Sequence, residues 1–119
     1  MKYMIMMFGE AGTMMEVKSP EWIREMIGFM RQLDVDLTNS GELVFNLGLA
    51  DGSTAKTVSN KDGLPVVTDG PFAEAKESLV GYWVVDVTSE ERVIEIASQI
   101  VKYAGVVEVR ESPAGPPEV

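Results

Sequence analysis

The sequence predicts a single α+β domain in which an antiparallel sheet carries two helices on one face. Short apolar runs, typical of strands, are separated by two longer stretches in which apolar residues recur every three or four positions, typical of amphipathic helices. Hydrophobic residues make up 45% and charged residues 24% of the 119 residues, a globular composition in a chain of one domain's length. The elements follow in the order strand, helix, strand, hairpin, strand, helix, strand.

The first third of the chain predicts a strand, a long helix and a second strand. Residues 2–8 form a short run that is apolar after Lys2, which is typical of a buried strand. Ser19 and Pro20 suit the N-cap and the first turn of a helix, which we expect to end near Gly41. Residues 42–49 have the character of a second strand. The helix carries an apolar stripe at spacings of three and four: Trp22, Met26, Met30, Leu33 and Leu37.

The middle of the chain predicts a small hairpin and the most apolar strand. Residues 56–59 and 65–68 flank residues 60–63, which end in an Asp-Gly pair. This pair is typical of a tight hairpin turn, because both residues tolerate positive φ. Residues 79–87 then form the longest apolar strand of the sequence.

A second helix and a last strand follow. Thr88 and Glu91 have the spacing of a capping box, so we expect Thr88 to cap the helix. Residues 106–110 are predicted to form the last strand. Residues 111–119 hold three of the six prolines, and we expect them to form a flexible tail outside a domain of residues 1–110. The helix carries this apolar stripe: Val93, Ile94, Ala97, Ile100 and Val101.

The order of the elements is that of the ferredoxin-like β-α-β-β-α-β fold with an inserted hairpin, in which both helices cover one face of the sheet. The first strand is apolar on both faces, with Tyr3 and Ile5 on one and Met4 and Met6 on the other. Two helices cover only one face, and soluble monomers rarely expose a large apolar patch. We therefore predict a homodimer in which two sheets pack face to face.

Charge and composition exclude several classes of function. Ten Lys and Arg residues against nineteen Asp and Glu give a net charge of -9, which repels nucleic-acid phosphates and anionic membrane surfaces. The chain has no cysteine and no histidine, so disulfides, thiolate chemistry and the commonest metal ligand are excluded. No apolar run has the length of a signal peptide or a membrane span, and we expect a cytoplasmic protein.

All eight methionines lie within the first 30 residues, which raises the question of a metal site. Thioethers bind Cu(I), but Met4 and Met6 are expected on the core face of the first strand and later methionines on the helix stripe, where methionine is ordinary filling. Asp34 and Asp36 are two positions apart on a helix, so they point apart. We predict no metal and no other cofactor.

Residues 69–77 (DGPFAEAKE) are too particular for a generic turn. They resemble the signature of the DGPF-motif branch of the YCII-related family, and the resemblance continues through Gly81, Tyr82 and residues 107–110. This family resemblance implies a ferredoxin-like dimeric α+β barrel. It implies little about the reaction: some relatives act on small aromatic or lactone-like molecules with a His–Asp pair, which a chain without histidine cannot have.

The signature carries the first set of candidate site residues. Asp69 is the candidate catalytic base, because a desolvated carboxylate at the mouth of a cleft can accept a proton. Phe72, Glu74 and Lys76 are candidate substrate-binding residues. The alternative is structural, with an Asx-type turn at Asp69, a loop anchor at Phe72 and an ion pair at Lys76.

The alternation of side chains along the strands gives a second set of candidate site residues. Tyr82 and Asp86 share one face of their strand, and Glu108 and Arg110 share one face of the last strand. We expect all four on the sheet face away from the helices, where a few polar groups among apolar ones are typical of a ligand cavity. Tyr82 and Arg110 would orient the substrate, and Asp86 and Glu108 would line its site. The alternative is an ion pair of Glu108 and Arg110, or one between subunits, that fixes the dimer register.

These residues lead to two functional hypotheses. The first is an enzyme without metal or nucleotide cofactor that transfers protons as a lyase or isomerase, with Asp69 as base and an oxygenated aromatic or acidic small molecule as substrate. The second is a non-catalytic dimeric module that binds a small ligand or a regulatory partner. The absence of histidine favours the second, because a carboxylate must then be strongly tuned for acid–base work. The long signature with its ionisable residues favours the first.

Overall fold

The computed structural model describes residues 1–9, 17–72 and 78–116. The predicted order of elements is confirmed, with β3 and β4 as the inserted hairpin. The last strand continues to Ser112, beyond the predicted start of the tail. In chain order the elements are β1 (Lys2–Phe8), α2 (Pro20–Asn39), β2 (Leu43–Gly48), the short 3-10 helix η1 (Gly52–Thr54), β3 (Lys56–Lys61), β4 (Leu64–Asp69), β5 (Leu79–Asp86), α3 (Glu90–Ala104) and β6 (Val107–Ser112).

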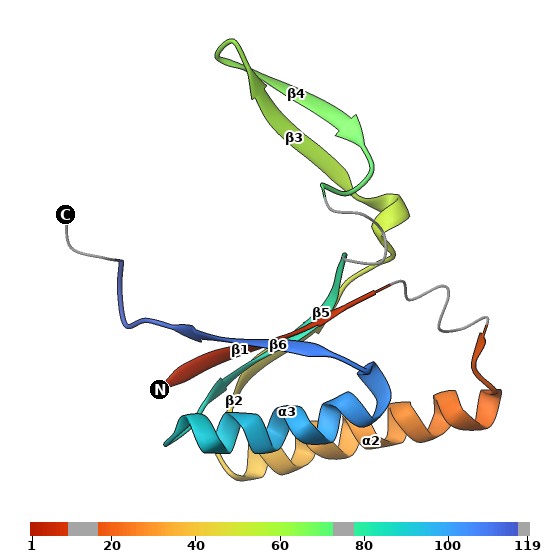
Figure 1. Ribbon diagram of the computed structural model, residues 1–119, viewed down its shortest axis with the longest axis vertical. Coiled ribbons are helices and arrows are strands. Elements are labelled where there is room, and N and C mark those ends of the chain that lie inside the picture. The colour runs from red at the N-terminus through yellow and green to blue at the C-terminus, as the bar shows by residue number, and fades with distance from the viewer. Residues whose placement is uncertain (10–16, 73–77, 117–119) are drawn as a thin grey trace.

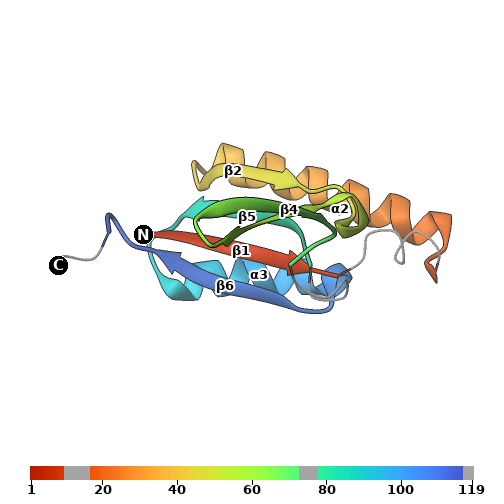
Figure 2. The same cartoon turned by 90° about the horizontal axis from the view of Figure 1, so that it is seen from above.

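Four strands form one antiparallel sheet in the order β2-β5-β1-β6, and β3 and β4 form a separate two-stranded sheet. Both helices lie on the same side of the larger sheet, α2 under the β2 edge and α3 under β1 and β6 (Figure 1; Figure 2). This is the ferredoxin-like α+β arrangement that the element order predicts. Neither helix of the described residues combines the length and the apolar character that crossing a membrane requires.

The core lies between the larger sheet and the helices. β1 and β5 contribute alternate residues, so Ile5 and Val85 are fully buried while their neighbours point to the other face. α3 faces the core with Ile96, whereas Ile94, which the predicted stripe contained, is 49% exposed. The buried hydrophobic residues are Tyr3, Ile5, Leu33, Leu37, Trp83, Val85, Val87, Val93, Ile96, Ala97 and Ile100.

The face of the larger sheet away from the helices, called the open face below, is largely apolar. Met4 and Met6 lie on it, so the prediction that they face the core is wrong: strand alternation gives the core positions of β1 to Tyr3 and Ile5. The strand register places these residues on the open face: Met4, Met6, Phe45, Leu47, Tyr82, Val84, Glu108 and Arg110.

The helix caps follow the predicted chemistry at α2 and shift by one residue at α3. Ser19 Oγ accepts a hydrogen bond from the Trp22 backbone N–H at 3.1 Å. At α3 the cap is Ser89 instead of the predicted Thr88, because Ser89 is the extended residue whose Oγ accepts from the Arg92 N–H at 3.2 Å. The capping-box position three residues after this cap is therefore Arg92. Its side chain does not return to the cap but binds Glu42.

Arg92 ties α3 to the start of β2 through a two-pronged ion pair with Glu42. Its Nε and Nη2 donate to the two Glu42 oxygens at 2.8 Å each, and Ser40 Oγ donates to the same carboxylate at 2.7 Å. The hydrogen bonds from Arg92 hold the pKa of Glu42 below its ordinary value of 4.5. Because this pKa is lower in the folded chain than in the unfolded one, the pair stabilises the fold above the ordinary pKa and loses its effect as the pH falls through the lowered value.

Replacing Glu42 by glutamine is expected to lower the free energy of unfolding at neutral pH by about 1.5–3 kcal/mol, the usual contribution of charge-assisted hydrogen bonds. The variant should also lose less stability than the wild type as the pH falls below the ordinary pKa of 4.5. Urea denaturation at pH values on both sides of this pKa measures both effects. Glu95→Gln is the control, since Glu95 also contacts Arg92, at 3.2 Å, but is 65% exposed. Equal pH profiles for the wild type and Glu42→Gln would contradict the prediction.

The β3–β4 hairpin turns at Asp62 and Gly63, as the sequence predicts. Both have positive φ, 53° and 84°, the combination of a type I′ turn, whose twist matches that of the strands. The Gly63 N–H donates to Asn60 Oδ1 at 2.9 Å, and at the hairpin base the Gly70 N–H donates to the Ala55 carbonyl at 2.8 Å. The hairpin rises from the end of β2 on the side of the open face and stands clear of the larger sheet (Figure 1).

Candidate functional site

Asp69, the predicted base, lies at the end of β4 with its side chain 88% exposed. Its carboxylate forms an ion pair with Lys56, the residue directly opposite on β3. Among the described residues no backbone N–H donates to it, so the hydrogen bond of an Asx-type turn is not seen there. A carboxylate this exposed stays hydrated, and within one chain Asp69 lacks the desolvation that the base role requires.

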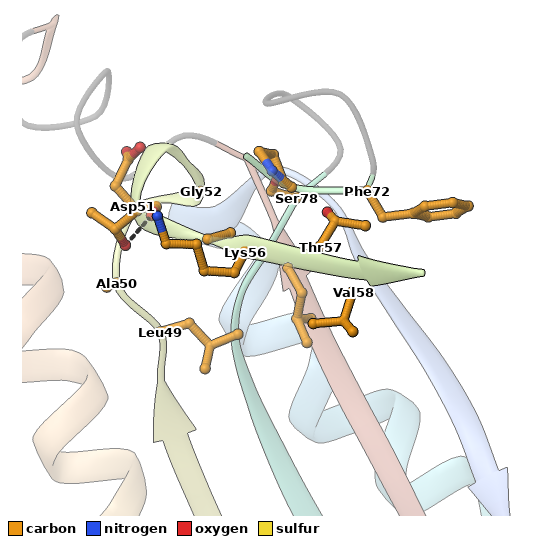
Figure 3. A pocket seen from close by; sticks show the side chains of 13 residues that line it. Leu49, Ala50, Asp51, Gly52, Lys56, Thr57, Val58, Phe72 and Ser78 are labelled. Carbon is orange, nitrogen blue, oxygen red and sulfur yellow. Dashed lines mark hydrogen bonds between the residues drawn. The ribbon is translucent and has the colours of Figure 1, made fainter. Parts of the chain in front are cut away.

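The rest of the signature divides between a groove and residues outside the described part of the chain. Glu74 and Lys76 belong to the latter. Phe72 is 97% exposed, so it does not anchor its loop in the core of its own chain. Pro71 and Phe72 line a groove at the base of the hairpin, shown in Figure 3.

This hairpin-base groove is wide, mostly apolar and has a volume of about 630 Å³. Leu49, Val58 and Phe72 contribute apolar side chains to it (Figure 3). η1 forms one wall, and it packs closely there: a Cβ on Gly52 would stand 3.0 Å from Ser78 Oγ. The described part of the signature therefore contributes to a surface groove.

The second predicted set lies on one side of the larger sheet, as strand alternation predicts. The register brings Tyr82 and Glu108 to either side of β1 on the open face. Arg110 forms an ion pair with Glu108, the structural alternative considered for these two residues. Asp86 accepts from the chain's terminal ammonium group at 3.0 Å. Asp69 is on the other sheet, so within one chain these residues and the predicted base do not form one site.

A second pocket, of about 400 Å³, lies between α2 and the β2–β5 part of the larger sheet. Asp34 of α2 supplies its carboxylate, and we call it the Asp34 pocket. Its walls are mostly apolar. The lining residues are Met7, Met26, Met30, Asp34, Asn46, Leu47, Gly48, Val80, Gly81, Tyr82 and Trp83.

Two donors from neighbouring strands hold the Asp34 carboxylate. Asn46 Nδ2 of β2 donates to Oδ1 at 2.7 Å, and Trp83 Nε1 of β5 donates to the same oxygen at 3.3 Å. Among the described residues no hydrogen bond to Oδ2 is formed. One oxygen is thus fixed by the fold, and the other is available to a ligand.

Two glycines make room for this pocket. Gly48 and Gly81 are directly paired across β2 and β5, so the sheet has no side chain at either position. A Cβ built on Gly48 would meet no atom of the described residues within 4 Å, which confirms open space beside it. Three methionines, Met7, Met26 and Met30, supply flexible, polarizable walls.

Asp34 was not predicted as a site residue, because the sequence offered it only as half of a possible metal-binding pair with Asp36. The available signal was its place on the apolar stripe of the helix. Asp34 comes four residues after Met30 and three before Leu37, so it shares their face. A carboxylate on the buried face of an amphipathic helix needs partners, and Asn46 is one of them.

The described architecture defines a class: a small ferredoxin-like α+β protein with a pocket between its first long helix and its sheet. The YCII-related domain matches residues 1–112, and the chain belongs to the YCII-related family. This confirms the family that residues 69–77 indicate. Membership of the DGPF-motif branch within the family stays a prediction.

Two individual proteins are similar to parts or all of the chain. An uncharacterized protein, R00369 of Rhizobium meliloti (strain 1021), is 35% identical over 52 residues, which are 44% of this chain and 42% of that protein. The chain therefore spans less than half the length of this curated relative. Among solved structures, 5-chloro-2-hydroxyhydroquinone dehydrochlorinase (TftG) from Burkholderia phenoliruptrix AC1100, in complex with 2,5-dihydroxybenzoquinone, aligns with a TM-score of 0.49 and 11% identity over 97% of this chain and 96% of its own.

Proposed function

We propose that this YCII-related protein is a small-molecule enzyme of the lyase or isomerase type in which Asp34 accepts a proton from the ligand. The observation that carries the proposal is the held carboxylate: Asn46 and Trp83 occupy Oδ1, and Oδ2 remains for the ligand. A general base must reach the proton it removes, and a fixed orientation favours that reach. Asp34 thus takes the role that the sequence suggested for Asp69.

The pocket favours a mostly apolar ligand with one acidic proton. Its volume of about 400 Å³ lies in the range of small-molecule sites. The indole of Trp83 and the thioethers of Met26 and Met30 suit an aromatic or other flat, polarizable group. In the proposed step a C–H beside a carbonyl gives its proton to Asp34 Oδ2, and the C–H electron pair moves into the carbonyl as an enolate. An isomerase returns the proton to another carbon, and a lyase expels a leaving group from the neighbouring carbon.

Asp34→Asn is expected to slow proton removal at least about 100-fold, the lower range for general-base catalysis, while the isosteric side chain keeps the hydrogen bonds to Oδ1. The measurement is proton NMR in D₂O, which follows exchange of C–H protons in aromatic acids, phenols and lactones that bind the wild type. Asp36→Asn is the matched control, because Asp36 is exposed on the same helix and accepts from Gln32 at 2.9 Å. Exchange at the wild-type rate in Asp34→Asn would overturn the base assignment.

The second candidate function is a binding module that holds the same ligands without turnover. The absence of histidine in the chain favours this alternative. Binding without exchange in the wild type would establish it over the enzyme. Gly48→Val tests whether the ligand binds in this pocket, and it leaves the Asp34 base unchanged. The new side chain enters open space and suits a strand, so it should abolish ligand binding under either function.

We also propose that the protein is a homodimer formed through the open face, in the cytoplasm. Phe45 and Leu47 are 47% and 54% exposed on this face, and Tyr82 packs edge-on against Phe45 with ring centroids 5.8 Å apart. An apolar patch of several strands is typical of an interface between subunits. A second, identical open face would cover it with matching strands and side chains.

A further inference from the structure

We infer that the β3–β4 hairpin is an arm that lies against the body of a second copy of this chain, and that this copy fills the hairpin-base groove. The inference rests on the homodimer proposed above. It goes further, because a dimer formed by the open faces alone would leave both the hairpin and its groove exposed.

The hairpin has too little support within its own chain. It is a sheet of two strands, and an isolated two-stranded hairpin is marginally stable in water at best. Val58 and Val67 lie directly opposite each other and are 64% and 62% exposed, and Phe72 just beyond β4 is 97% exposed. These apolar side chains need a surface to pack against, and the described residues of their own chain do not provide one.

The extended shape of the chain also indicates that the hairpin lacks support within its own chain. Its radius of gyration is 16.6 Å, with extents of 48, 46 and 19 Å. A compact domain of this length has a radius of gyration of about 13.5 Å. The hairpin contributes to this excess, because it rises above the open face at an angle to the sheet (Figure 1). The hairpin-base groove lies in the corner between the hairpin and the sheet. A second copy packed on the open face would contact the hairpin there.

The length of the hairpin predicts what it reaches. Strands of six residues span about 20 Å, whereas sheets packed face to face are only about 10 Å apart. The hairpin is therefore long enough to pass the sheet of the second copy and to contact the edge of its helical layer. A two-fold axis would repeat the same contact on the other side, so two arms would clasp the pair.

The charges of the open face favour a second copy over an unrelated partner. The chain carries a net charge of -9, yet the charges that the strand register places on this face balance. Lys2 lies opposite Asp86, and Glu108 forms an ion pair with Arg110. Two such faces meet without net repulsion, although the molecules are strongly acidic elsewhere. A basic partner would be attracted to the acidic remainder of the surface instead.

The test uses the absence of cysteine, which makes any introduced cysteine unique. Lys61→Cys next to the hairpin turn, carrying a benzophenone maleimide, is irradiated in an equal mixture of ¹⁴N- and ¹⁵N-labelled chains. We expect crosslinks that join the two isotopes, located by mass spectrometry. Gln99→Cys on the exposed side of α3 is the matched control and should give none. Replacing residues 56–69 by a short Gly-Ser loop should raise the dimer dissociation constant at least about tenfold, a loss of about 1.4 kcal/mol.

The outcomes distinguish failure of the hairpin arm from failure of the homodimer. A wild-type dimer in sedimentation, with Lys61→Cys crosslinked only within its own chain or not at all, would overturn the arm while leaving the dimer intact. An unchanged dissociation constant after the loop replacement would do the same. A monomeric wild type would overturn the dimer and the arm together. A small molecule that binds in the hairpin-base groove of the dimer would show that the second copy does not fill it.

Discussion

Phe45→Asp is expected to convert the proposed dimer into a monomer at micromolar concentration. Phe45 lies on the edge strand β2 and is half exposed in the single chain, so the new carboxylate stays hydrated while the chain is alone. In a face-to-face dimer each copy would bury one unpaired charge. Such a charge costs about 3–5 kcal/mol, so the dissociation constant should rise at least about 100-fold.

Sedimentation velocity over a concentration series measures this change. Val35→Asp is the matched control, because Val35 is 51% exposed on α2, on the helical side of the sheet, and the substitution adds the same charge. We expect Val35→Asp to remain dimeric. A dimeric Phe45→Asp, or equal dissociation of both variants, would mean that the open face is not the interface.

Ile5→Ala is expected to lower the free energy of unfolding by about 2–5 kcal/mol, the range for large-to-small substitutions in a core. Ile5 is 0% exposed on β1, between Trp83 of β5 and Val109 of β6. β1 pairs with strands on both sides and cannot shift easily to fill the lost volume, which places the expected loss in the upper part of the range. Most domains have a total stability of about 5–15 kcal/mol, so this single change removes much of it.

Guanidinium denaturation at one fixed protein concentration measures the loss, since the stability of a dimer depends on concentration. Ile5→Val should lose only about 0.5–1.5 kcal/mol. Ile94→Ala is the surface control, because Ile94 is 49% exposed on α3, and it should change stability by less than about 0.5 kcal/mol. A loss in Ile94→Ala equal to that in Ile5→Ala would contradict the assignment of the core.

The fold was predictable because its signals are local. The Asp62–Gly63 turn, the Ser19 cap and the alternation along residues 79–87 each act within a few residues, and the structure confirms all three. One error was local and one was not. Thr88 and Ser89 have equivalent capping chemistry, and only the start of the helix in three dimensions selects Ser89. Which face of β1 meets the helices depends on pairing with distant strands, and so Met4 was assigned to the wrong side.

The candidate site was harder to predict because it is built from residues far apart in the sequence. Asp34, Asn46 and Trp83 come from one helix and two strands, and no short motif contains them. The signature at residues 69–77 is conspicuous in sequence, but its described part, residues 69–72, contributes to a hairpin base and a groove. The paired glycines that open the pocket, Gly48 and Gly81, become neighbours only through the register of β2 and β5.

The hairpin is inserted between two strands that are neighbours in the sheet, and this has an evolutionary consequence. The Leu49 N–H donates to the Val80 carbonyl at 2.9 Å, which closes the ladder where the insertion leaves and returns. The larger sheet is therefore continuous across the segment inserted between β2 and β5. Doubling the length of a turn costs only about 0.6 kcal/mol, so this segment can lengthen, shorten or be exchanged at little thermodynamic cost. Assembly and chemistry can then diverge independently on one inherited scaffold.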